Sequence, residues 1–128
     1  MLVIIGSGDH FLGNHISGVL DRLELRKIRT IKLDRIIREL KQPDRLVIID
    51  LSWKEVQKPG VLRQMVNIGR ISGNQVICVT PNDDDKLKKI AQNARPEEVF
   101  LRYDLETGVK EFLEKAAQDY LDRKTAEQ

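Results

Sequence analysis

One stretch decides the fold of this chain: Leu46-Val47-Ile48-Ile49-Asp50-Leu51-Ser52. Aliphatic residues run without alternation up to Asp50, and turn-forming residues follow. A short apolar run of this kind predicts a strand buried on both faces, as in a parallel sheet covered by helices. Its carboxyl end would lie at the rim of the sheet, where open α/β sheets bind ligands. Asp50 is therefore a candidate site residue, although an acid in this place also caps a following turn or helix.

Strand-like and helical patterns alternate along the rest of the chain. Apolar runs or alternation at residues 2–5, 28–33, 75–80 and 98–102 predict four more strands. Helical spacing predicts helices over 10–24, 34–41, 59–71, 81–94 and 106–121, with Asp34 as an N-cap and acids 83–85 at the start of the fourth helix. Successive β-α units predict a parallel sheet with right-handed crossovers. We therefore expect an α/β fold, a three-layer flavodoxin-like (βα)5 sandwich with a five-stranded parallel sheet in the order 2-1-3-4-5.

Composition indicates a soluble globular protein, because 41% of the 128 residues are hydrophobic and 33% are charged. We expect one domain over residues 1–121 and a frayed polar tail over 122–128. The net charge of +2 is too small to indicate nucleic acid binding. The sequence shows neither a membrane-length apolar run nor a basic leader, so a cytoplasmic location is expected. The single cysteine, Cys78, stands in an apolar run and is expected to be buried.

Polar residues follow several of the predicted strands. Because parallel strands end at one edge, these residues are expected to become neighbours. A carboxylate, a hydroxyl and a cation together suit an anion or a phosphoryl group. The rim residues are Gly6, Ser7 and Asp9 after the first strand, Asp50 and Ser52 after the third, Thr80 after the fourth, and Arg102 at the end of the fifth.

Three segments carry a family resemblance. Residues 43–51 resemble the phosphoacceptor strand of the receiver domain of two-component response regulators, and residues 76–80 and 99–102 resemble its fourth and fifth strands. The resemblance extends over residues 2–121. It implies that Asp50 is the phosphoryl acceptor, Thr80 the switch hydroxyl, and Arg102 the cation that contacts the phosphoryl group, in the place of the family's Lys.

The sequence also departs from the family. The pair of acids that binds Mg²⁺ after the first strand is replaced by Gly6 and Ser7, so a metal site built from Asp9 and Asp50 requires the loop to bend Asp9 into place. Tyr103 replaces the Pro that follows the family's Lys, and Arg differs from Lys in reach and geometry. These departures favour a divergent, pseudo-receiver type without standard Mg²⁺-dependent phosphorylation.

The main alternative is a small-ligand, nucleotide or phosphate-binding α/β domain. The loop Gly6-Ser7-Gly8 precedes a helix, where backbone N–H groups bind phosphate, and Asp9 completes this set of loop ligands. The dinucleotide fingerprint is incomplete, because its third glycine position is Phe11. An enzyme is not expected, since no nucleophile and base pair stands out.

We expect the partner to be a protein, either a sensor kinase or a downstream signalling protein. The resemblance implies a homodimer surface made by the fourth helix, the fifth strand and the fifth helix, where Tyr103 would lie. Trp53, in the loop after Asp50, shields the site, anchors a partner or packs on the fourth helix, and the sequence leaves these three alternatives open. Membrane and nucleic acid partners are not expected.

Overall fold

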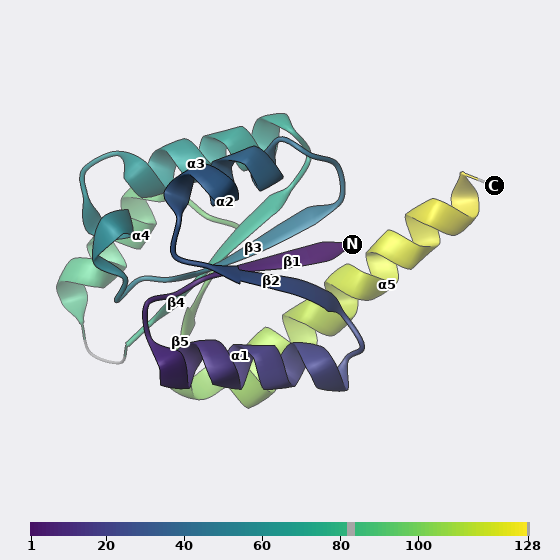
Figure 1. Cartoon of the computed structure of the whole chain (residues 1–128), viewed down its shortest axis with the longest axis horizontal. Coiled ribbons are helices and arrows are strands. Elements are labelled where there is room, and N and C mark those ends of the chain that lie inside the picture. The colour runs from purple at the N-terminus through teal and green to yellow at the C-terminus, as the bar shows by residue number, and fades with distance from the viewer. Residues whose placement is uncertain (82–83, 128) are drawn as a thin grey trace.

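Five strands alternate with five α-helices in the computed structural model of the chain (Figure 1). The structure describes residues 1–81 and 84–127. Short 3₁₀ turns span Lys54–Gln57 and Arg102–Asp104, and a π turn spans Leu105–Val109. The strands are β1 Leu2–Gly6, β2 Arg26–Thr30, β3 Arg45–Asp50, β4 Gln75–Thr80 and β5 Glu98–Leu101, and the helices are α1 His10–Arg22, α2 Leu33–Leu40, α3 Val61–Ile71, α4 Asp85–Ala94 and α5 Lys110–Ala126.

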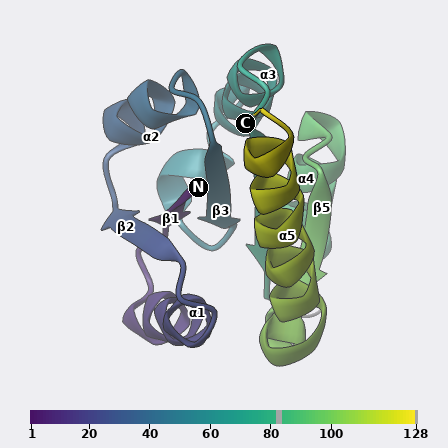
Figure 2. The ribbon, with the colours of Figure 1, turned by 90° about the vertical axis from the view of Figure 1, so that its right-hand side faces the viewer.

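The strands form one parallel sheet in the order β2-β1-β3-β4-β5, as predicted. Figure 2 views the molecule with the N-terminus toward the reader, so that β2 lies on one side of the sheet and β5 on the other. Helices α2, α3 and α4 cover one face, and α1 and α5 cover the other (Figure 1). The predicted three-layer flavodoxin-like fold is therefore confirmed.

Strand β3 lies at the centre, paired with β1 on one side and β4 on the other. Its side chains alternate between the two cores: Val47 and Ile49 pack in the layer of α2, α3 and α4, and Leu46 and Ile48 pack in the layer of α1 and α5. All four are at most 1% exposed. Burial of each such side chain contributes about 1.5–3 kcal/mol relative to exposure, so this one strand stabilises both helical layers and fixes Asp50 at its end.

Two predicted boundaries near β2 are wrong. The strand spans Arg26–Thr30 and not 28–33, because its register with β1 ends where β1 ends, at Gly6 paired with Thr30. The Thr30 hydroxyl then accepts a hydrogen bond from the Lys32 backbone and turns the chain. Helix α2 starts at Leu33 with Lys32 as N-cap, so Asp34 lies in the first turn and is not the cap.

The chain end also differs from its prediction. Helix α5 spans Lys110–Ala126, so the predicted helix end at residue 121 is wrong, and Lys124 within these last turns pairs with Asp44 at 3.1 Å. The last turns of α5 extend past the other elements in Figure 1. Helix α4 has Asp84 as its N-cap, while residues 82–83 of its predicted start lie outside the described residues.

None of the helices in residues 1–81 and 84–127 is both long and apolar enough to cross a membrane.

Candidate functional site at the carboxyl edge of the sheet

Asp50 ends β3 and is fully buried, with 0% of the residue exposed. Both of its carboxyl oxygens accept hydrogen bonds. The Ser7 hydroxyl donates to Oδ2 at 2.8 Å, and the Ser52 backbone N–H and hydroxyl donate to Oδ1 at 2.9 and 2.6 Å. Buried polar groups are stable only when paired in this way. Asp50 is therefore a centre that joins the loop after β1 to the turn after β3.

Ser52 and Ser7 hold the Asp50 side chain, and sequence reasoning did not assign them that task. An Asp whose carboxyl oxygen accepts from the backbone two residues later forms an Asx turn, and the Asp50-to-Ser52 spacing is a signal that could have revealed it. Ser7 was expected beside Asp50 at this edge, but nothing in the sequence, where 43 residues separate the two, indicated the hydrogen bond between them.

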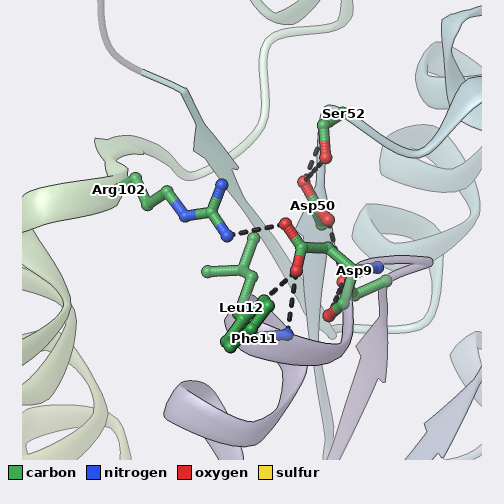
Figure 3. Close-up of polar contacts among 7 residues, drawn as sticks. Asp9, Phe11, Leu12, Asp50, Ser52 and Arg102 are labelled. Atoms are coloured by element: carbon green, nitrogen blue, oxygen red, sulfur yellow. Dashed lines mark hydrogen bonds and ion pairs between the residues drawn. The ribbon is translucent and has the colours of Figure 1, made fainter.

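Asp9 pairs with Arg102 across the site (Figure 3). The Arg102 guanidinium donates to Oδ2 of Asp9 at 2.6 Å, and Oδ1 of Asp9 accepts from the backbone N–H groups of Phe11 and Leu12 at 2.8 and 3.2 Å. The Arg102 hydrogen bond, followed by these backbone bonds, holds the pKa of Asp9 below its usual value. The structure thus joins Arg102 to Asp9, whereas the resemblance implied a contact with a phosphoryl group on Asp50.

Thr80 ends β4 next to β3 and is 1% exposed. Its hydroxyl donates to the carbonyl oxygen of Pro81 at 3.2 Å. Among the described residues it makes no hydrogen bond to Asp50. Thr80 is at the predicted edge, and its switch role stays a prediction.

Gly6 is required for space and not for backbone freedom, since neither it nor Gly8 has a positive φ. A Cβ on Gly6 would meet Ile36 Cδ1 at 2.9 Å, Ile49 Cδ1 at 3.0 Å and Trp53 Cζ3 at 3.0 Å. The position of the family's first acid therefore faces closely packed apolar side chains.

Trp53 is 8% exposed and belongs to the core cluster that includes Leu87 and Ala91 of α4. The structure therefore packs this ring in the core on the side of α4, and its expected role as a partner anchor stays a prediction. The ring lies against the loop after β1, since the Cβ position of Gly8 is 3.5 Å from it. Tyr103, by contrast, is 66% exposed.

The donor set at this edge does not fit Mg²⁺, which requires oxygen ligands in near-octahedral geometry, typically carboxylates with water and phosphate. Gly6 and Ser7 supply no carboxylate where the family has its two acids. Asp9 uses Oδ1 for the cap of α1 and Oδ2 for Arg102. The described residues contain no group of three or more His, Cys, Asp or Glu side chains that could hold a metal ion.

Comparison with known proteins supports the fold. The sequence matches no protein-family model and no curated protein. A CheY-like response regulator receiver domain protein from Methanospirillum hungatei JF-1 matches with a TM-score of 0.65 at 14% identity, over 92% of this chain and 97% of that chain. RcsB from Salmonella enterica serovar Typhimurium matches with a TM-score of 0.62 at 20% identity, over 93% and 67%. A response regulator receiver protein from Burkholderia phymatum matches with a TM-score of 0.55 at 20% identity, over 78% and 81%.

These similarities define the class of structure: the chain has the fold of CheY-like receiver domains. The resemblance noted in the sequence is thereby confirmed at the level of the fold. At 14–20% identity the similar structures do not assign a function. Function has to be argued from the site itself.

Proposed function

We propose that this chain is a divergent receiver-like signalling module that works through protein contacts, without Mg²⁺-dependent phosphorylation of Asp50. One observation carries the proposal: both carboxyl oxygens of Asp50 are engaged by Ser7 and Ser52 in a fully buried position. Because Asp50 is 0% exposed, a phosphodonor could reach its oxygens only after the residues around it move, and attack would disturb the hydrogen bonds that hold them. Asp50 then serves to fix two loops relative to each other.

The replacement of the family's acids supports the same conclusion. Ser7 donates to Asp50, whereas an acid in its place would repel it and bind a metal. Arg102 is held by Asp9 at 2.6 Å, so a phosphoryl group on Asp50 would have to compete for that guanidinium. Each part that phosphoryl transfer needs is either absent or engaged in another contact.

We propose a protein partner, either a sensor kinase or a downstream signalling protein, and a cytoplasmic location. The exposed Tyr103 follows β5 and adjoins the proposed surface of α4, β5 and α5. Aromatic side chains are enriched among the residues that dominate protein interfaces. The same surface is our candidate for a homodimer contact.

A phosphodonor titration tests the proposal. The full chain is mixed with Mg²⁺ and either beryllofluoride or acetyl phosphate, and the amide signals of Asp50, Thr80 and Arg102 are followed by NMR. We expect no shifts specific to these residues and no gain of a phosphoryl group by mass spectrometry. Asp50→Asn supplies the background. A phosphoryl adduct on the parent chain that Asp50→Asn lacks would overturn the proposal.

The alternative, phosphate binding by the backbone of the Gly6–Gly8 loop, is not favoured. The N–H groups of Phe11 and Leu12 at the start of α1 already donate to the Asp9 side chain. Ser7 also accepts from the Asp9 backbone at 3.1 Å, which closes the loop on itself. A phosphate at this helix end would have to displace a carboxylate that is part of the chain.

A further inference from the structure

A cleft of about 680 Å³ lies beside this closed site, between the loop after β1 and the start of α2. Ser7 and Gly8 line one side, and the end of β2 and the first turns of α2 line the other. A second hollow of about 660 Å³ shares Gly8, Ile31, Lys32, Arg35 and Arg38 with it and reaches Trp53, and the acids Asp34 and Glu55 line this second hollow. Each hollow has the size of a small-molecule site.

The cleft gathers positive charge. Arg29, Lys32, Arg35 and Arg38 line it together with His10, and no Asp or Glu of residues 1–81 and 84–127 does. The ion pairs among the described residues include none of Lys32, Arg35 and Arg38. The whole chain is nearly balanced, with 22 Lys and Arg against 20 Asp and Glu. Cations gathered in a concave surface favour an anion.

Arg29 is positioned by two residues of α1. Its guanidinium donates from Nη1 to the Asn14 side chain at 2.7 Å. It also lies directly over Gly13, where a Cβ would overlap its Nη2, Cζ and Nε atoms. Glycine destabilises the interior of a helix relative to alanine. Gly13 therefore has a use that offsets this loss: it lets Arg29 lie flat on α1 at the mouth of the cleft.

Ile31 supplies an apolar surface in the same cleft as these cations. It follows the last paired residue of β2 and is 65% exposed. It lines both hollows, whereas the other large exposed hydrophobic side chains of the described chain line neither. An exposed apolar side chain among cations suits a ligand that has both an apolar part and negative charge.

We propose that this cleft binds a small ligand of nucleotide size that carries two or more phosphate groups. Arg29, Arg35 and Arg38 contact the phosphates, since the planar guanidinium matches phosphate oxygens in pairs. Lys32 adds charge, and Ile31 contacts the apolar part of the ligand. The site uses side chains and not the α1 amides, which Asp9 occupies. Asp50 itself is not among the residues that line the cleft.

Calorimetric titration at constant ionic strength tests the proposal on the full chain. The probes are ADP, pyrophosphate and adenosine. We expect ADP and pyrophosphate to bind and adenosine to bind far more weakly. Arg35→Ala with Arg38→Ala should weaken ADP binding by about tenfold or more, because each loses a charge-assisted hydrogen bond. Lys89→Ala with Lys115→Ala removes the same charge at exposed positions of α4 and α5 and should leave the affinity unchanged.

Gly13→Ala separates ligand binding from folding. The added methyl group displaces the flexible end of Arg29, so ADP affinity should fall severalfold. The midpoint of thermal unfolding should stay the same or rise, because alanine favours the helix. A damaged fold would instead lower both the ADP affinity and the midpoint of thermal unfolding.

Three results would overturn the proposal. The first is no binding of ADP or pyrophosphate at millimolar concentration. The second is equal loss of affinity in the Arg35/Arg38 and Lys89/Lys115 variants, which would indicate diffuse charge only. The third is binding of a single-stranded oligonucleotide without binding of ADP, which would assign the cleft to nucleic acid. Phosphorylation of Asp50 is measured separately by mass spectrometry, so failure of ADP binding is distinguished from failure of the proposed function.

Discussion

Replacing Gly6 by Ala tests whether packing has filled the place of the family's first acid. The new Cβ would lie 2.9–3.0 Å from atoms of Ile36, Ile49 and Trp53. Carbon atoms in proteins prefer about 3.5–4.0 Å, so all three side chains must move. These side chains are 0%, 0% and 8% exposed, and a packed core has little room for such shifts. Overpacking of this kind costs about 1–3 kcal/mol.

Urea unfolding followed by circular dichroism measures the loss, with Gly8→Ala as the matched control. The Cβ of Gly8 would meet only Trp53 Cδ1, at an ordinary 3.5 Å. Gly8→Ala should therefore change the free energy of unfolding by less than about 0.5 kcal/mol. Equal stability of Gly6→Ala and Gly8→Ala would refute the reasoning, because it would show that the side chains beside Gly6 move aside at no cost in stability.

Gly6→Asp extends the same test to the metal. The carboxylate would enter the space lined by Ile36, Ile49 and Trp53 without a hydrogen-bond partner there. We expect a larger loss of stability than with Ala, since an unpaired buried charge adds several kcal/mol. Mg²⁺ should not restore it. A variant that folds normally and is stabilised by Mg²⁺ would show that the receiver metal site needs only one acid to return.

Three further outcomes follow from the site. Asp50→Ala should lower the free energy of unfolding by about 2–4 kcal/mol, because the Ser7 and Ser52 donors lose their acceptor. Asp50→Asn keeps an acceptor oxygen and should cost much less. An Ala variant more stable than the parent would contradict this. Arg102→Ala should cost at most about 1 kcal/mol at neutral pH, since its ion pair with Asp9 is partly exposed. The lowered pKa of Asp9 makes that contribution present at neutral pH and lost as the pH falls through the folded-state pKa, so unfolding curves of parent and variant should converge in acid. Burial raises the pKa of the Cys78 thiol to about 12, so a thiol reagent should label the unfolded chain only.

The fold was predictable because the signals that define it are local. The runs that became β3 and β4 are apolar on both faces, and the helices show their spacing in short windows. Element boundaries depend on distant partners. Strand β2 ends at Thr30 because its partner β1 ends at Gly6. The alternation of residues 28–33 gives no information about where β1 ends. Ile31 therefore leaves the sheet although its own sequence pattern favours a strand.

The sequence predicted which residues lie at this edge of the sheet better than it predicted which of them contact one another. Parallel strands bring Asp50 and Thr80 to one edge whatever their side chains do. The pairing of Arg102 with Asp9 depends on how the loop after β1 folds, and a glycine-containing loop shows no periodicity from which to read it. The packing of Trp53 beside Gly6 was hidden for a related reason, since a glycine gives no sign of what fills the space above it.

The charges at the carboxyl edge of the sheet indicate that the part around Asp9 and Asp50 and the part beside β2 differ in their need for a bound ion. Asp9 is balanced by Arg102, and the oxygens of Asp50 are satisfied by Ser7 and Ser52. This part needs no further ion, because its carboxyl groups already have partners within the chain. On the β2 side, Lys32, Arg35 and Arg38 take part in none of the ion pairs among the described residues, and the exposed Ile31 lies beside them. If a ligand controls this receiver-like fold, the uncompensated charge places its binding beside β2 and α2, next to Asp50 but not on it.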